Sequence, residues 1–207
     1  MQRFQQAVRA AVAAAAIIGL TARGAMAAET HTVAGTTYAK DGSTYTARHV
    51  LQSSLQTADL LSICFDFKHL QGFYHGSDVK LLKSGADWQT LEYRTDYKVC
   101  ASSATYQKTV DRAKNTVRFT MLNHQVSGWG MPVMLASSGS YAIEYTTNIR
   151  RLTYEQSVTL TREIGPLDWA MIQRKTTEFF TGLEAYIRQQ EGLRAQPHAS
   201  QKAIPTP

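Results

Sequence analysis

Side chains that can carry out acid–base, nucleophilic or metal chemistry are scattered through this chain of 207 residues. His69 and His75 lie six residues apart, which does not place two ligands on one helix face. We therefore expect solvated side chains here rather than a metal site with Asp66 or Asp78. The sequence contains no Gly-x-Ser-x-Gly, no phosphate-binding glycine loop and no His-Glu-x-x-His. It predicts no catalytic residue, no metal ligand and no cofactor.

The two cysteines, Cys64 and Cys100, have more than one interpretation. In an oxidising compartment an even pair of cysteines can form a disulfide. Cys64 also lies in an apolar run that predicts a helix, and a buried free thiol is equally consistent with that position. A nucleophile–base pair of Cys64 with His69 is disfavoured, because reactive thiols need a polar, partly exposed setting.

Aromatic and large apolar side chains recur on the predicted strands and on the last predicted helix. Any one of them is explained as core, since aromatic residues at strand or helix spacing usually pack inside. As a set they would also form the wall of a cavity, with tyrosine hydroxyls to orient the polar end of a ligand. The ligand-binding residues predicted on these elements are Tyr93, Tyr97, Phe119, Tyr145, Tyr154, Phe179 and Leu183.

The segment 127–135 combines two glycines and a proline with several large apolar residues, among them Trp129 and Met131. Exposed loops of this composition often act as lids or contact a membrane or a partner. A loop that folds back over the core fits the same pattern, and the sequence does not separate the two. Trp129 and Met131 join the predicted ligand-binding residues.

The body of the chain has the period-two alternation of half-buried strands. The pattern predicts a strand at 44–52, short helices at 55–65 and 68–74, and antiparallel strands at 79–83, 88–97, 102–110, 116–122, 140–146 and 150–161. Strands followed by a helix, rather than a strict alternation of the two, indicate an α+β fold and argue against a parallel nucleotide-binding sheet.

The last long segment, 166–190, predicts one amphipathic helix. Its stripe at three-then-four spacing consists of Trp169, Ile172, Thr176, Phe179, Phe180, Leu183 and Ile187. Pro166 favours a helix start and Gly192 a helix end. Because the preceding strands are the only broad apolar partner in the sequence, the helix should pack across them and leave a groove for a ligand.

The N-terminal segment 1–27 has the features of a secretory signal peptide. Arg3 and Arg9 precede an apolar run of eleven residues, 10–20, which is too short to span a membrane. A small-x-small site predicts cleavage after Ala27, and a retained anchor is the alternative. We expect a loose lead-in at 28–43, one domain at 44–191 and a disordered tail at 192–207.

Loss of residues 1–27 would lower the formal charge from +6 to +3, because the segment carries three arginines and no acids. A chain that is only mildly basic, with charges that alternate in sign along the sequence, lacks the basic patch that is typical of nucleic-acid-binding proteins. We therefore expect no nucleic-acid partner. The leader predicts a periplasmic or secreted protein.

The order of elements resembles the helix-grip fold of the START-like (SRPBCC) superfamily, which includes polyketide cyclase/dehydrase and lipid-transport proteins. The segment Phe65-Asp66-Phe67-Lys68-His69-Leu70 with Phe73-Tyr74 is similar to the passage after the family's first helix. Ser138-Gly139-Ser140-Tyr141 resembles its Gly-x-Trp strand start, with Tyr in place of Trp. The resemblance implies two short helices after the first strand and a curved antiparallel sheet wrapped around a long C-terminal helix.

This resemblance also implies a cavity for an apolar or aromatic molecule, and it brings no universal catalytic residues. We expect an exported binding or carrier protein for an apolar or amphipathic small molecule, plausibly a lipid, with transient contact to a membrane or a transporter. The alternative is a cyclase/dehydrase-type enzyme acting on an aromatic or polyketide-like substrate in the same cavity. A module whose groove takes a peptide or partner helix is a third possibility.

Overall fold

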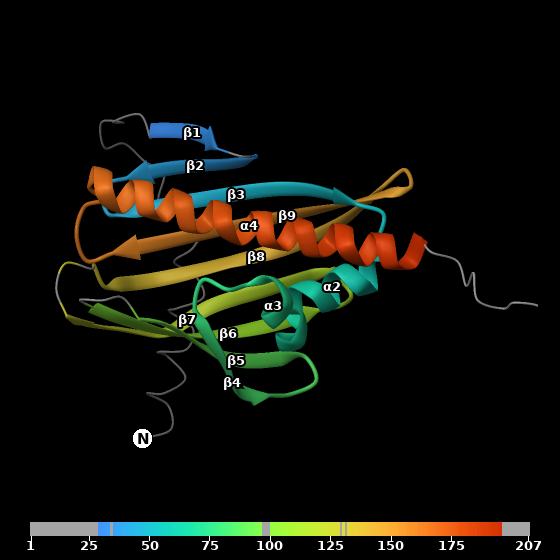
Figure 1. Cartoon of the computed structure of the whole chain (residues 1–207), viewed down its shortest axis with the longest axis horizontal. Helices are drawn as coiled ribbons and strands as arrows, with labels where there is room; N and C mark the ends of the chain where they lie inside the picture. The colour runs from blue at the N-terminus through green and yellow to red at the C-terminus, as the bar shows by residue number, and fades with distance from the viewer. Residues whose placement is uncertain (1–28, 34, 97–99, 129, 131, 196–207) are drawn as a thin grey trace, which may run out of the picture.

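The computed structural model describes residues 29–195 except 34, 97–99, 129 and 131. Nine antiparallel strands form one sheet in the order β1-β2-β3-β9-β8-β7-β6-β5-β4, and three helices pack on it (Figure 1). The strands are β1 (Glu29–Val33), β2 (Thr36–Asp41), β3 (Thr44–Ser53), β4 (Asp78–Ser84), β5 (Trp88–Asp96), β6 (Cys100–Asp111), β7 (Thr116–Gly128), β8 (Met134–Thr146) and β9 (Ile149–Leu160). The helices are α2 (Thr57–Phe65), α3 (Phe67–Phe73) and α4 (Pro166–Ala195).

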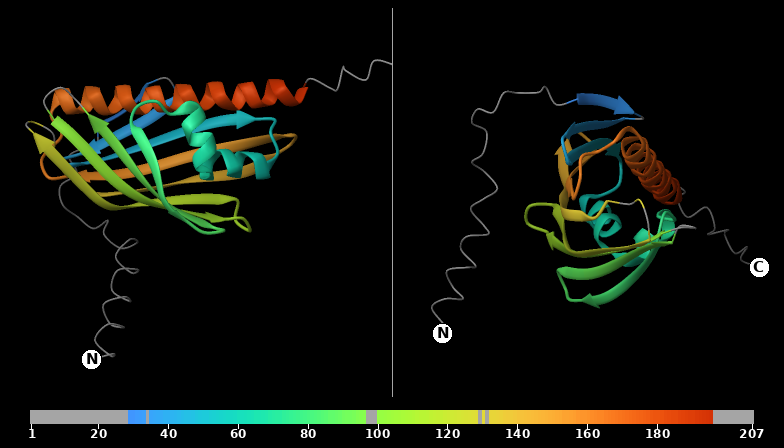
Figure 2. Two further views of the ribbon diagram at one scale, coloured as in Figure 1. Left: turned by 60° about the horizontal axis from the view of Figure 1, so that its bottom comes forward. Right: turned by 90° about the vertical axis from the view of Figure 1, so that its left-hand side faces the viewer.

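The sheet is curved and does not close, since β1 and β4 lie at its two ends. Figure 2 shows α4 running along the length of the concave side, with the sheet bending around the interior below it. The helix α2 lies on the same side, next to β6, β7 and β8, and α3 packs against α2 and α4. This α+β, helix-grip arrangement confirms the predicted fold class.

The alternation predicted for the strands and the stripe predicted for the last helix are confirmed by the burial of the side chains. On β9, Leu152, Tyr154, Val158 and Leu160 are buried and Glu155 is exposed. The main core lies between the sheet and the three helices, and it contains Leu60, Leu91, Val117, Leu152, Phe180, Leu183 and Ile187. A smaller core under the first turns of α4 contains Tyr38, Ala47, Val158, Leu160, Ile164 and Trp169.

The prediction of a loose lead-in at 28–43 was wrong, because β1 and β2 occupy most of it. The segment contains few large apolar residues, so the usual alternation was too weak to indicate strands. Thr36 and Tyr38 are nevertheless fully buried on β2. Gly42, at φ 57°, forms the tight connection from β2 to β3, and only glycine adopts that conformation without strain.

Two other predicted boundaries were also wrong. Both ends of the predicted loop 127–135 belong to strands, because β7 continues to Gly128 and β8 begins at Met134. The last helix passes through Gly192, the predicted stop, and ends at Ala195. The carboxylate of Asp59 on α2 accepts two hydrogen bonds from Arg194, which holds this last turn in place. In the part of the chain that is described, none of the helices is both long and apolar enough to cross a bilayer.

Candidate ligand-binding cavity

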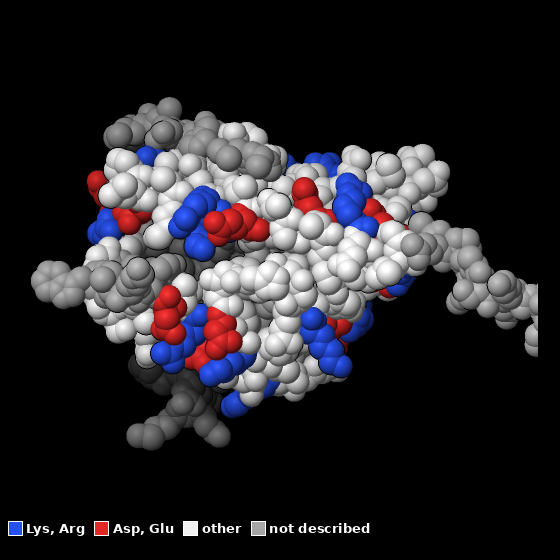
Figure 3. Space-filling view, in the orientation of Figure 1, with Lys and Arg blue, Asp and Glu red and all other residues white. Residues whose placement is uncertain are grey.

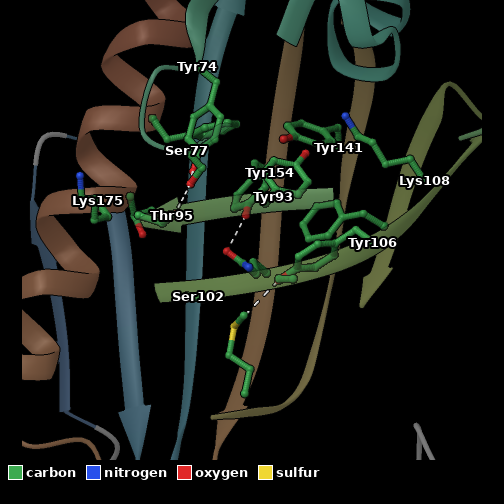
Figure 4. Close-up of a pocket in the computed structure, with 16 residues that line it drawn as sticks. Tyr74, Ser77, Tyr93, Thr95, Ser102, Tyr106, Lys108, Tyr141, Tyr154 and Lys175 are labelled. Carbon is green, nitrogen blue, oxygen red and sulfur yellow. Dashed lines mark hydrogen bonds between the residues drawn. The ribbon is translucent and has the colours of Figure 1, made fainter. Parts of the chain in front are cut away.

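A cavity of about 270 Å³ lies between α4 and the inner face of β5–β9 (Figure 4). Seen from outside, the surface is recessed between α4 and the strands below it (Figure 3). Seven of the sixteen lining residues are aromatic, and smaller hydroxyl residues lie between them. The lining residues are Tyr74, Ser77, Tyr93, Thr95, Ser102, Ala104, Tyr106, Lys108, Phe119, Met134, Tyr141, Tyr154, Gln156, Lys175, Thr176 and Phe179.

The strand β6 runs along the length of the cavity. Its inward positions alternate from Ser102 through Ala104 and Tyr106 to Lys108, as the period of two requires. The register of β5 against β6 places Thr95 opposite Ser102 and Tyr93 opposite Ala104. Alternate residues of two neighbouring strands therefore build one continuous wall.

The aromatic rings of the wall support one another. Tyr154 stacks on Phe119 with ring centroids 5.7 Å apart, and its centroid lies 5.0 Å from that of Tyr141. Tyr93 meets Tyr106 edge to face at 5.6 Å. Burial raises the pKa values of Tyr93, Tyr106, Tyr141 and Tyr154. These hydroxyls stay protonated at neutral pH, so they are hydrogen-bond donors and not bases.

Gly139 makes room for the deep part of this wall. A Cβ at this position would clash with Cζ of Phe119 and with the carbonyl oxygen of Glu155. Gly139 is the glycine of the segment that resembles the family's Gly-x-Trp start, and Tyr141 of the same segment lines the cavity. The segment therefore shapes the cavity in two ways. Gly139 leaves space because it has no side chain, and the ring of Tyr141 forms part of the wall.

The outer part of the cavity is lined by small hydroxyl residues. The Oγ of Ser77 lies 2.5 Å from Oγ1 of Thr95, and the Oγ of Ser102 lies 2.9 Å from Nε2 of His124. Because the backbone N–H of Met134 donates to Nδ1 of His124 at 2.8 Å, the ring proton belongs on Nε2 and points at Ser102. A histidine in that state donates to the serine and cannot take its proton, so the pair is not an activated nucleophile.

Lys108 lies near the C-terminal end of β6, at the inner end of the cavity, and its side chain is buried. Its Nζ donates to the carbonyl oxygen of Cys64 at 2.7 Å, near the C-terminal end of α2. Burial lowers the pKa of Lys108 to about 8, although Cys64 and Asp66 oppose the shift. The inner end of the cavity therefore holds an amine that titrates close to neutral pH.

Four of the predicted ligand-binding residues line the cavity: Tyr93, Phe119, Tyr154 and Phe179. Leu183 is buried in the main core, one helical turn from Phe179, and does not reach the cavity. Tyr145 is 64% exposed near the β8–β9 turn, where Arg150 lies over its ring at 5.0 Å. Tyr145 shares the face of β8 with the buried Tyr141 and Ile143, but its side chain is left uncovered. Tyr97, Trp129 and Met131 lie outside the described residues.

Sequence reasoning missed several lining residues, chiefly Tyr106, Lys108, Met134 and Tyr141. Tyr106 shares the inward positions of a predicted strand, and this period-two signal could have identified it. Lys108 shares the same positions, but a lysine on a half-buried strand is ordinarily assigned to the solvent side. Its role was accessible only from the structure.

The thiol of Cys64 is not a reactive nucleophile. It is buried, and burial raises its pKa to about 12. The Nδ1 of His69 lies 2.7 Å from the hydroxyl of Tyr186, so the imidazole interacts with α4 instead. Within the described ranges, no cluster of three His, Cys, Asp or Glu side chains could hold a metal ion.

Cys64 and Cys100 are both free in the structure. Lys108, whose ammonium binds the carbonyl of Cys64, follows Cys100 by eight positions on β6. At about 3.3 Å per residue, the strand separates Cys100 from Lys108 by roughly 26 Å. A disulfide requires Cα atoms within about 7 Å, so this geometry leaves the two thiols unpaired.

No protein-family model matches the sequence, and no curated protein is detectably similar to it. Solved structures with the same architecture are similar at low sequence identity. A STAR-related lipid transfer protein from Xanthomonas axonopodis is 12% identical, with a TM-score of 0.56 over 78% of this chain and 98% of its own. An aromatase/cyclase from Streptomyces sp. R1128 is 12% identical, with a TM-score of 0.53 over 75% of this chain and 98% of its own.

Norcoclaurine synthase from Thalictrum flavum, in complex with dopamine and hydroxybenzaldehyde, is 11% identical. Its TM-score is 0.53 over 75% of this chain and 90% of its own. The names of these three proteins describe different functions. What the three structures share with this protein is the arrangement of sheet and helices. The chain has the helix-grip fold of the START-like superfamily.

Proposed function

We propose that the protein binds an apolar or amphipathic small molecule in the cavity between the sheet and α4. The observation that supports this most directly is the 270 Å³ cavity itself, walled by aromatic side chains. Each methylene group moved from water into such an interior contributes about 0.8 kcal/mol, so burial alone gives useful affinity. The names of proteins with similar folds, lipid transfer among them, agree with a hydrophobic ligand.

The volume limits the ligand. A cavity of 270 Å³ is about nine times the roughly 30 Å³ that a water molecule occupies in the liquid. It therefore has room for about ten non-hydrogen atoms. Its volume lies just below the range of about 300–1,000 Å³ that is typical of pockets for drug-sized ligands. This favours a single short alkyl chain or a one- or two-ring aromatic over a two-chain lipid.

The enzyme alternative, of the cyclase/dehydrase kind, requires a group that exchanges a proton beside the ligand. The wall tyrosines do not qualify as bases, because burial raises their pKa values well above neutrality. Lys108 alone among the lining residues combines full burial with a pKa near neutral. One such amine, already bonded to a backbone carbonyl, supports a binding role better than a two-group acid–base mechanism.

We propose further that the protein acts in the periplasm or after secretion, where it shields its ligand from water during transfer to a membrane or a partner protein. The basis is the signal-peptide pattern of residues 1–27, which lie outside the described residues. Mass spectrometry of the protein isolated from its own compartment tests both parts. Cleavage after Ala27 and a copurifying small molecule are the expected results.

Filling the cavity tests the binding function. Ala104 faces the cavity from β6, so Ala104→Leu should occupy part of its volume. We expect this variant to bind an uncharged probe, 1-decanol, at least tenfold more weakly by calorimetry. Ala142→Leu, which faces away from the cavity on β8 between the inward Tyr141 and Ile143, is the matched control. Equal affinities of the two variants would contradict a ligand in this cavity.

A further inference from the structure

The inner end of the cavity contains a positive charge that the protein does not neutralise. Lys108 is 5% exposed and lies between Gln89 on β5 and Phe119 on β7. No carboxylate lies within ion-pair distance of its ammonium in the described part of the chain. A buried ammonium without a paired anion is costly, which is why burial lowers the pKa of Lys108.

One of the three N–H donors of Lys108 has a clear structural role. It binds the carbonyl of Cys64 at 2.7 Å, and a cation near the C-terminal end of α2 is favourable. The nearest acid, Asp66, acts only from a distance, and it already accepts a hydrogen bond from the hydroxyl of Ser62. Two N–H donors of the ammonium are therefore left over.

Further polar groups without partners surround this end of the cavity. The hydroxyls of Tyr93 and Tyr141, which line it, have no hydrogen-bond partner among the residues described, and the ammonium lies 5.9 Å from the centroid of the Tyr141 ring (Figure 4). Burial raises the pKa values of both tyrosines, so both hydroxyls can donate. The amide oxygen of Gln89, directly across from Lys108, is buried and also lacks a partner within the described ranges. The ammonium and the two tyrosine hydroxyls therefore supply more donors here than the protein uses, whereas the Gln89 oxygen is an acceptor.

We propose that Lys108 binds the carboxylate end of the ligand, with the hydroxyls of Tyr141 and Tyr93 as further donors, so that the cavity selects small apolar acids over uncharged molecules of the same size. This inference rests on the proposed binding function. A single ammonium matches a single negative charge, whereas a phosphate dianion would require a second buried cation. The other lining cation, Lys175, is 38% exposed and paired with Glu178 at 3.0 Å. The arrangement therefore fits a monocarboxylate.

A pair of ligands that differ only in the head group tests the anchor. We expect the wild-type protein at pH 7 to bind decanoate at least tenfold more tightly than 1-decanol, since charge-assisted hydrogen bonds are about twice as strong as neutral ones. Lys108→Met should remove this preference, so that the variant binds decanoate and 1-decanol with similar affinity. Equal binding of both compounds by the wild type, or a preference that survives Lys108→Met, would overturn the anchor while the binding function stands.

The pH dependence of the wild type tests the same anchor without a variant. The groups that face Lys108 are Cys64, Asp66 and Tyr141, and burial keeps the thiol and the phenol neutral at pH 7. Decanoate should bind most tightly below pH 8 and weaken towards pH 9.5 as the free protein's ammonium loses its proton. The affinity for 1-decanol should stay constant over this range. A constant ratio of the two affinities contradicts the anchor, and absence of binding by both compounds contradicts the proposed function itself.

Discussion

The imidazole of His49 stacks on the ring of Phe180, with centroids 4.1 Å apart and planes 9° apart. The same imidazole bridges β2 and α4, because its Nδ1 lies 2.9 Å from Oγ1 of Thr36 and its Nε2 lies 3.0 Å from Oε1 of Glu184. This stack fixes α4 on the sheet at the point where the neighbouring Phe179 enters the cavity.

His49→Ala should therefore lower the free energy of unfolding by about 2–4 kcal/mol, since it removes a buried ring and leaves the hydroxyl of Thr36 unsatisfied. Urea denaturation followed by circular dichroism measures the change. His75→Ala, on an exposed histidine, is the control and should shift the midpoint little. Similar midpoints for the two variants would show that the stack does not hold the helix.

Gly139→Ala should destabilise the protein by about 1–3 kcal/mol, because an added methyl group overpacks the core. One of the two atoms it would meet belongs to the backbone of Glu155 and has little freedom to move. The thermal melting temperature and the affinity for 1-decanol should both fall. Gly192→Ala is the matched control, because the methyl group it adds would meet no atom within 4 Å and α4 continues through this position. It should raise stability by about 0.5–1 kcal/mol, and a neutral effect of Gly139→Ala would contradict the close packing.

The two thiols should differ in reactivity. At pH 8 a thiol whose pKa is about 12 is a thiolate in roughly one molecule in ten thousand, and the thiolate is the reactive form. Iodoacetamide should therefore alkylate the partly exposed Cys100 and spare Cys64 in the folded protein. Peptide mass spectrometry after timed quenching measures both rates, and unfolded protein provides the control with equal rates. A peptide containing both cysteines joined by a disulfide would refute the assignment of free thiols.

The stability of the protein should fall in acid partly through Glu191. Burial alone would raise the pKa of this carboxyl, but hydrogen bonds from Ser53, Arg188 and Ser54 outweigh it and lower the pKa. The carboxylate accepts from Oγ of Ser53 and from the backbone N–H of Ser54, both at 2.7 Å. A lowered folded-state pKa means that the stabilisation is complete above the ordinary value of 4.5 and is lost as the pH falls through the folded-state pKa.

Glu191→Gln should accordingly lower the free energy of unfolding by about 1–2 kcal/mol at pH 7. The difference from the wild type should shrink below pH 4. Urea midpoints at several pH values measure it, with Glu163→Gln, at an exposed position, as the control. A difference that stays constant down to pH 3 would show that the carboxylate charge is not responsible.

The fold was predictable where the sequence pattern and burial coincide. The stripe from Trp169 to Ile187 and the alternation on β9 contain large apolar residues at the required spacing, so their faces followed from periodicity. The strands β1 and β2 did not follow, because polar residues supply most of them. Their position is fixed by partners distant in sequence, such as the Thr177 hydroxyl 3.3 Å from that of Tyr38.

The cavity was predictable only in part. Aromatic residues on inward positions indicated Tyr93, Phe119, Tyr154 and Phe179, but periodicity cannot show where a helix ceases to cover a strand. Tyr145 shares the inward face of β8 and is nevertheless exposed. Lys108 illustrates the converse, since only the packing of α2 over β6 shows that this lysine is enclosed.

Among the described strands, β4 has a neighbour on one side only, and Leu81 and Leu82 on this edge strand are exposed. Such an edge attracts another strand, and charged side chains are the usual defence. Lys80 and Lys83 flank the two leucines and are exposed. If two copies met edge to edge along β4, the like charges of these lysines would repel each other. Replacing both lysines by neutral residues should therefore allow the protein to self-associate through this edge.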